Sequence, residues 1–382
     1  MELTKEYILR VAKEFFEVDS IIDIQVLKGG HINSTYLVVF PECRYILQQI
    51  NKYVFYSPQA VMNNMILLTN YIMKKCVYDG KSRNRAGLNL VPTRYDQFFA
   101  IVDDEYWRCT EYIEGGICYE TTSDEHVFKE VGKAVGNFHY MLTGFHTRLI
   151  DDPIKNFHDT PIRYQNFLED IAEVDEQLLN TCKEEIAYID SRKDQMDCIV
   201  KGLRDGLLKR RVCHNDTKLS NVMMDEKTGK YMCLIDLDTA MKGAIAYDFG
   251  DALRCGASTA EEDEVDLNKV SINFDLVRAF TRGFISALKP KRDNIYITPE
   301  EVKSLYDGYY IITLELGMRF LDDYLIGNKY FRIDENRPFH NLERARNQLK
   351  LAKEIEKNKD TIIGIINEAL VDKGFGEEYL IK

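Results

Sequence analysis

A short stretch near the middle of the chain has the residue types and spacing that phosphoryl transfer requires. His214, Asp216 and Asn221 form an HxDxxxxN pattern, and the apolar run Met232–Ile235 that follows it ends in Asp236. Phosphoryl transfer needs a carboxylate beside the attacking hydroxyl and oxygen ligands for Mg²⁺, and kinases supply them as Asp, Asn and Asp in this order. We therefore predict that Asp216 is the catalytic base and that Asn221 and Asp236 bind Mg²⁺.

The chemistry accounts for each residue type in this pattern. Mg²⁺ prefers hard oxygen donors, which suits the amide oxygen of Asn221 and the carboxylate of Asp236. Asp216 is expected to orient the acceptor hydroxyl and to take its proton late, because a loose transition state asks little of a strong base. Either half of the pattern alone would be read as a capped turn or as the end of a buried strand. The two halves together, in order, favour phosphoryl transfer.

The residues before this stretch predict a small antiparallel lobe. Short β-rich runs separated by turn residues indicate strands, and apolar residues at helical spacing indicate one helix. The expected strands span residues 24–27, 35–40, 44–50, 98–102 and 107–112, and the expected helix spans 58–71. We place the end of this lobe in the linker before Gly115, so that residues 1–114 form a nucleotide-binding lobe.

The remaining residues, 115–382, predict a larger and mainly helical lobe that carries the catalytic pattern and a substrate pocket. Thr122 fits the first residue of a capping box before a helix. Helical spacing also covers residues 306–326, where Gly308 and Gly317 weaken the prediction of one unbroken helix. The expected fold class is therefore α+β, with two lobes.

Composition excludes several kinds of function. The formal charge of −12 disfavours nucleic acid as a partner, because binding to phosphate backbones needs clustered Lys and Arg. The nine cysteines never form a CxxC pair, which argues against a zinc site or a disulfide framework. The charged segment at residues 1–6 is unlike a signal peptide, and no apolar run reaches membrane-spanning length. We expect a cytoplasmic protein with no membrane partner.

Several separate segments resemble the aminoglycoside phosphotransferase and choline kinase superfamily, and within it most closely the N-acetylhexosamine 1-kinases. These segments are residues 29–36, 45–51, 214–221, 235–239 and 247–254. The resemblance implies a two-lobed, protein-kinase-like fold. It also implies ATP between the lobes and a sugar in a pocket of the helical lobe.

The same resemblance suggests which residues would meet the nucleotide. They are Gly29, Gly30, His31 and Asn33 in a phosphate-covering turn, Gln48 on the third strand, and Glu111 and Ile113 at the hinge. The Gly-Gly pair is also typical of a plain hairpin turn, and the hinge segment could be a simple linker. Protein kinases place a Lys where Gln48 stands, so the phosphate contact loses a charge. His214 and Asp248 are expected to support the catalytic loop.

A late helix suggests the acceptor. Arg319 lies in a segment that resembles the sugar-facing part of the hexosamine kinases, and Tyr330 or Phe331 could cover the apolar face of a sugar. The alternative is a purely structural role, in which Arg319 forms an ion pair with Asp322 or Asp323 on the helix surface. The resulting prediction is an ATP- and Mg²⁺-dependent kinase that phosphorylates the anomeric hydroxyl of an N-acetylhexosamine, GlcNAc or GalNAc. A kinase for an aminoglycoside, choline or another small alcohol, and a nucleotide-binding pseudokinase, remain as alternatives.

Overall fold

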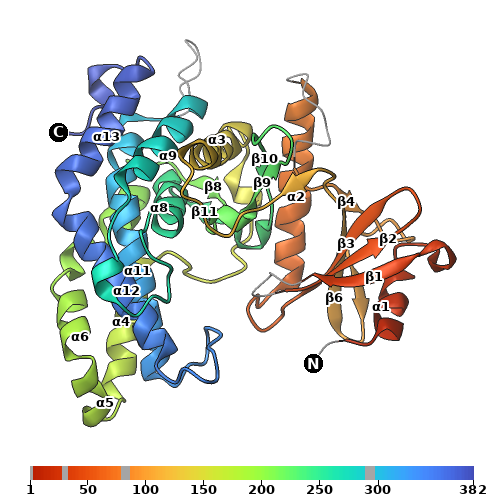
Figure 1. Ribbon diagram of the computed structural model, residues 1–382, viewed down its shortest axis with the longest axis horizontal. Coiled ribbons are helices and arrows are strands. Elements are labelled where there is room, and N and C mark those ends of the chain that lie inside the picture. Colours follow the sequence, from red (N-terminus) through yellow and green to blue (C-terminus); the bar gives the residue numbers. More distant parts are fainter. Residues whose placement is uncertain (1–2, 28–32, 79–86, 289–296) are drawn as a thin grey trace.

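The structure is a computed structural model that describes residues 3–27, 33–78, 87–288 and 297–382 (Figure 1). A small lobe built on an antiparallel sheet lies beside a larger, mainly helical lobe (Figure 1). This arrangement confirms the predicted α+β fold of two lobes. In the described parts of the chain, no helix is both long and apolar enough to cross a membrane.

The small lobe is a twisted sheet whose strands follow the order β1-β2-β3-β6-β4, with β5 paired to β6. The strands are β1 (Asp23–Leu27), β2 (Ser34–Val39), β3 (Arg44–Ile50), β4 (Leu90–Val91), β5 (Ala100–Val102) and β6 (Glu105–Glu111). The helix α1 (Lys5–Ala12) packs on this sheet through a cluster that includes Ile8, Val11 and the fully buried Trp107. The strand predictions are therefore confirmed to within a few residues at their ends.

The helix α2 (Pro58–Tyr78) lies between the lobes (Figure 1) and is longer than the predicted segment. Its buried Asn64 donates hydrogen bonds to the carbonyl oxygens of Asp151 and Ala240, and accepts one from the N–H of Asp151. These contacts fix the helix to the larger lobe, while its Val61, Met62 and Met65 pack in one cluster with Ile50 of the sheet.

The larger lobe combines two small sheets with a helical core. Its strands are β7 (Gly116–Ile117), β8 (Arg211–Cys213), β9 (Val222–Asp225), β10 (Tyr231–Leu234) and β11 (Met241–Gly243). Its helices are α3 (Glu125–Met141), α4 (Thr160–Ala172), α5 (Glu176–Thr181), α6 (Lys183–Asp190), α7 (Cys198–Arg204), α8 (Ile245–Gly256), α9 (Phe274–Ala287), α10 (Pro299–Lys303), α11 (Leu305–Leu325), α12 (His340–Lys357) and α13 (Lys359–Asp372). Strands β9 and β10 form a hairpin between the two halves of the catalytic pattern.

Two details differ from the sequence prediction. The N-cap of α3 is Asp124, whose side chain accepts from the N–H of His126, whereas Thr122 caps only the turn before it. Helix α11 is unbroken through both of its glycines. A side chain at Gly308 would lie 2.1 Å from the carbonyl oxygen of Ala246 in α8. Glycine is therefore required there for close helix packing, and this explains its presence within the helix.

Candidate active site

Helix α8 holds the catalytic loop through two aspartates on one face of its first turns. The carboxylate of Asp248 accepts from the N–H groups of His214 and Asn215, both at 2.8 Å. The carboxylate of Asp251, one turn later, accepts from the N–H of Thr217 at 2.7 Å. Because side chains three residues apart share a helix face, the two acids can satisfy successive N–H groups of one loop. The backbone on both sides of Asp216 is thus held in place by hydrogen bonds to α8.

Two residues of the site have left-handed backbone conformations. Asn215 has φ 63° and Asp236 has φ 60°, values that Asn and Asp tolerate better than most residues. The amide of Asn215 also donates to the carbonyl oxygen of Thr239 at 2.8 Å. The ring of His214 is 2.8 Å from the carbonyl oxygen of Ile235, directly before Asp236. These bonds join the catalytic loop to the end of the strand that carries the second aspartate.

The carboxylate of Asp216 is held by two neighbours. One of its oxygens accepts from Lys218 Nζ at 3.0 Å and from Asn221 Nδ2 at 2.9 Å. Asn221 also donates to the backbone oxygen of Asp216, so its amide nitrogen is committed to the loop and its amide oxygen is left for another partner. Burial alone would lower the pKa of Lys218, but the carboxylates of Asp216 and Asp236 raise it by more than burial lowers it. The pKa therefore lies above its usual value, and this side chain stays charged.

The surroundings of Asp236 suit a cation. Burial, and next the carboxylates of Asp238 and Asp216, raise the pKa of Asp236 to about 6, while Arg108 and Lys218 lower it. No donor among the described residues bonds to its side chain. A crowded carboxylate of this kind is stabilised in its charged form by a metal ion, and the free amide oxygen of Asn221 is a second hard ligand. The residues present therefore fit Mg²⁺, which would neutralise phosphate charge there.

A polar network joins the small lobe to the residues just after Asp236. On β3, Gln48 donates to Thr35 Oγ1 at 3.0 Å and accepts from the guanidinium of Arg108, its register partner on β6. Arg108 also pairs with the carboxylate of Asp238. Asn33 donates to the other oxygen of Asp238 at 2.6 Å. The predicted nucleotide residues Gln48 and Asn33 thus meet in one network at the junction of the lobes.

The other predicted nucleotide residues have different outcomes. Gly29, Gly30 and His31 lie outside the described residues. At the hinge, the N–H of Glu111 donates to the carbonyl oxygen of Asn89, so it is not free for a nucleotide. The N–H of Ile113 has no acceptor among the described residues, and it remains the hinge group that could meet an adenine edge.

Asp216 and Arg319 line the same pocket, which has a volume of about 740 Å³ and also includes Tyr330. The guanidinium of Arg319 lies over three rings, at 5.2 Å from Phe157, 5.5 Å from Tyr330 and 5.3 Å from Phe331. No carboxylate in the described parts of the chain pairs with it. Its predicted alternative partner Asp323 instead accepts from the N–H groups of residues 329–331.

The carboxylates of this pocket are already engaged. Glu315 contacts the ring of His158 at 2.8 Å and accepts from Thr160, and Glu262 pairs with Arg254 at 2.8 Å. Burial alone would raise the pKa of Glu315, but His158, Arg319 and Thr160 hold it below its usual value. The pocket therefore presents a cation and aromatic rings more readily than a free carboxylate.

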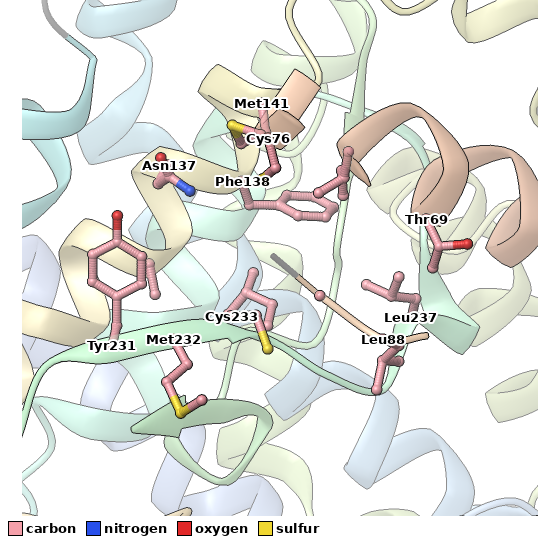
Figure 2. A pocket seen from close by; sticks show the side chains of 14 residues that line it. Thr69, Cys76, Leu88, Asn137, Phe138, Met141, Tyr231, Met232, Cys233 and Leu237 are labelled. Atoms are coloured by element: carbon pink, nitrogen blue, oxygen red, sulfur yellow. The ribbon is translucent and has the colours of Figure 1, made fainter. Parts of the chain in front are cut away.

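A separate cavity of about 300 Å³ lies beside β10, the strand that precedes Asp236 (Figure 2). Figure 2 shows Cys76 of α2, Phe138 and Met141 of α3, and Met232 and Cys233 of β10 around it. Among the residues that the structure describes, no charged side chain and no predicted site residue lines this cavity. Its chemistry is that of an apolar core space, so it does not compete with the pocket at Asp216 as the acceptor site.

His139, Cys213 and Asp248 form a buried cluster behind the catalytic loop, with ligand atoms within 4.8 Å of one another. Both oxygens of Asp248 already accept from the catalytic loop, and His139 Nε2 lies 2.9 Å from one of them. Burial raises the pKa of the Cys213 thiol well above its usual value, and its Sγ donates to the carbonyl oxygen of Ala244. The oxygens of Asp248 and the thiol of Cys213 are therefore already engaged in hydrogen bonds within the protein.

Sequence reasoning missed three residues of this site, Lys218, Asp251 and Arg108. The first two had local signals, because Lys218 lies within the catalytic pattern and Asp251 is spaced one helical turn after Asp248. Arg108 had a weaker signal, an arginine between the apolar residues Trp107 and Cys109 of a strand. Its partner Asp238 is 130 residues away, so no local pattern could join them.

Comparison with known proteins agrees with this geometry. The sequence pattern of the phosphotransferase enzyme family matches residues 23–280, which is more than half of the chain. Similar solved structures include a microcompartment-associated aminopropanol kinase, with a TM-score of 0.64 and 15% identity over 94% of this chain and 98% of that one. A spectinomycin phosphotransferase in complex with ADP and spectinomycin has a TM-score of 0.58 and 14% identity, covering 94% and 100% of the two chains.

An ethanolamine kinase of Plasmodium vivax has a TM-score of 0.58 and 13% identity, covering 91% of this chain and 90% of that one. At such low identities these structures establish the fold, while the match to the family pattern establishes membership. The chain thus belongs to the phosphotransferase enzyme family, and it is a phosphotransferase.

Proposed function

We propose that the chain is an ATP- and Mg²⁺-dependent kinase that phosphorylates the anomeric hydroxyl of an N-acetylhexosamine, GlcNAc or GalNAc. The observation that carries the proposal is the position of Arg319, whose guanidinium lies in the pocket of Asp216 and pairs with no carboxylate of the described residues. Such a group can donate to ring hydroxyls or to an acetamido carbonyl. The choice of the anomeric position rests on the resemblance of the segments named above to the hexosamine kinases.

The residues around Asp216 can perform the transfer step. The acceptor hydroxyl would donate to Asp216, its oxygen would bond to the γ-phosphorus, and the bond from that phosphorus to the β,γ-bridging oxygen would break to release ADP. Asp216 receives the hydroxyl proton. Lys218, which already touches Asp216, lies beside the reacting oxygens and offsets their negative charge. Mg²⁺ bound by Asn221 and Asp236 would neutralise phosphate charge.

A cationic acceptor, such as an aminoglycoside, choline or ethanolamine, is the second possibility. It would need a carboxylate free to bind an ammonium group. Glu315 and Glu262 line the pocket, but each already has protein partners. The sugar is therefore favoured, and a pseudokinase is disfavoured because Asp216, Asn221 and Asp236 lie together as a complete set.

The test is ADP release with Mg²⁺ and ATP across free sugars, N-acetylhexosamines, choline, ethanolamine and aminoglycosides. We expect turnover of GlcNAc or GalNAc and none of their methyl glycosides, because methylation blocks the anomeric hydroxyl. The product should also lose its reducing end. Turnover of only the amino alcohols or aminoglycosides would overturn the sugar proposal, and silence on the whole panel would favour a pseudokinase.

The role of Arg319 has its own measurement. Arg319→Ala should lower kcat/KM for the N-acetylhexosamine by roughly 10- to 100-fold, the usual cost of a lost charge-assisted hydrogen bond. Arg278→Ala, which removes a surface partner of Glu368, is the matched control and should leave kcat/KM unchanged. Equal values for the two variants would remove Arg319 from the acceptor site.

A further inference from the structure

Arg108 is a buried cation at the junction of the lobes. Its side chain is only 1% exposed, and a charge so far from water requires close partners. The partners are the amide oxygen of Gln48, at 3.1 Å from Nε and 3.0 Å from Nη2, and the carboxylate of Asp238, which bonds to Nη1. Removing a charge from water costs free energy, and this cost suggests that the buried guanidinium has a functional role.

The position is close to the proposed phosphate site. Asp238 follows the proposed metal ligand Asp236 by two residues. The charge of Arg108 also acts on Asp236, because it lowers the pKa of that carboxyl. Gln48, the residue that stands where kinases place a phosphate-binding Lys, is directly opposite Arg108 in the sheet. The cation of Arg108 thus lies next to Gln48, the position on β3 where protein kinases have a Lys.

The guanidinium has donors to spare. Three of its N–H groups bond to Gln48 and Asp238. A guanidinium carries five N–H groups in a fixed fork, so two remain, and neither has an acceptor in the described parts of the chain. These two donors, one on Nη1 and one on Nη2, lie in one charged plane and can bond to phosphate oxygens. Lys218, the other cation near the site, is already bound to Asp216 on the acceptor side.

We propose that Arg108 contacts the β- or γ-phosphate of the nucleotide and that Asp238 orients it. Protein kinases pair the Lys on β3 with a Glu on the following helix, and α2 has no Glu. In this chain the phosphate cation would instead come from β6 and its carboxylate from the segment after β10. Asn33, which bonds to the second oxygen of Asp238, keeps that carboxylate in place. The proposal rests on the proposed ATP site and does not depend on the acceptor.

The test compares nucleotides that differ only in phosphate. Calorimetry would give the affinities of adenosine and Mg²⁺-ADP for the wild-type protein, Arg108→Gln and Arg108→Lys. We expect both variants to bind adenosine as the wild type does. ADP affinity should fall by roughly 10- to 100-fold in Arg108→Gln, and by less in Arg108→Lys, which keeps the charge but not the fork.

Two further variants separate phosphate binding from structure. Asp238→Asn keeps the size of the side chain but removes the charge that orients Arg108, so it should weaken ADP by less than Arg108→Gln does. Arg192→Gln breaks a two-bond pair with Glu356 away from the site, and it should change neither affinity. Because Arg108→Gln loses a buried pair, Arg108→Lys provides the test if that variant does not fold.

The outcomes are distinct. An unchanged ADP affinity in the Arg108 variants, or an equal loss for adenosine and ADP, would mean that Arg108 only joins the lobes, and the inference would be overturned. If the wild-type protein binds no adenine nucleotide, the proposed ATP site itself fails and this inference fails with it. Turnover of an acceptor other than a sugar would leave the Arg108 result intact.

Discussion

Asp216 has one carboxylate oxygen bonded to Lys218 and Asn221, which leaves the second oxygen for the acceptor hydroxyl. We expect Asp216→Asn to lower kcat at least 100-fold, because the amide cannot take the proton, while ADP affinity stays within about 2-fold. Steady-state ADP release and calorimetry would measure the two quantities. Activity close to that of the wild type would exclude Asp216 as the base.

Asp248 acts on the same loop through its backbone. Asp248→Asn replaces one acceptor oxygen by an NH₂ group that faces an N–H, so one loop donor loses its partner. We expect a loss of about 2 kcal/mol in the free energy of unfolding and a roughly 100-fold fall in kcat as Asp216 shifts. Urea unfolding and kinetics would test both. Asp275→Asn, at an exposed position on α9, should change neither, and an unchanged kcat in Asp248→Asn would contradict the bracing role.

At the scale of elements, helices α4 and α11 meet at a carboxylate pair. Burial, and next Asp170 and Asp323, raise the pKa of Asp322 to about 7, against the opposing charge of Arg163. The unfolded value is 3.8, so between pH 4 and pH 7 the folded protein binds more protons than the unfolded one. The contribution of Asp322 to stability is therefore complete below pH 4 and is lost as the pH rises through 7.

Asp322→Asn should remove this dependence. We expect the variant to be more stable than the wild type at pH 8, and its stability to vary less between pH 5 and pH 8, where one proton accounts for a slope on the order of 1 kcal/mol per pH unit. Urea unfolding at each pH measures the difference. Asp194→Asn, an exposed carboxylate in the same lobe, is the control, and equal slopes in the two variants would refute the argument.

The elements also show which features a sequence can specify. The strand at residues 44–50 matches β3 throughout, because a short β-rich run and a preceding Pro-Glu turn are local signals. The sequence around the start of α3 could not show which residue caps the helix, since Thr122 and Asp124 are both good N-caps. In the structure α3 begins after Asp124. The pairing of Arg108 with Asp238 could not be predicted, because it depends on how two lobes meet.

At the scale of the molecule, Asn64 joins α2 of the small lobe to Asp151 and Ala240 of the larger one. Asn64→Ala would leave three backbone groups without this partner, one of them in a buried bond and two in partly buried bonds, at a cost of about 2 kcal/mol. We expect this loss to uncouple the lobes. Asn63→Ala, on the exposed face of the same helix, removes only a bond with Gln59 and is the matched control.

Two probes can separate the lobes in one denaturation experiment. The single tryptophan, Trp107, lies in the core of the small lobe, so its fluorescence follows that lobe, whereas far-UV circular dichroism follows mainly the helices of the larger lobe. In the wild type and in Asn63→Ala the two transitions should coincide, as expected for cooperative unfolding. In Asn64→Ala the fluorescence transition should move to lower denaturant than the dichroism transition. Coincident transitions in that variant would mean that other contacts, such as the pair of Arg108 and Asp238, suffice to keep the lobes coupled.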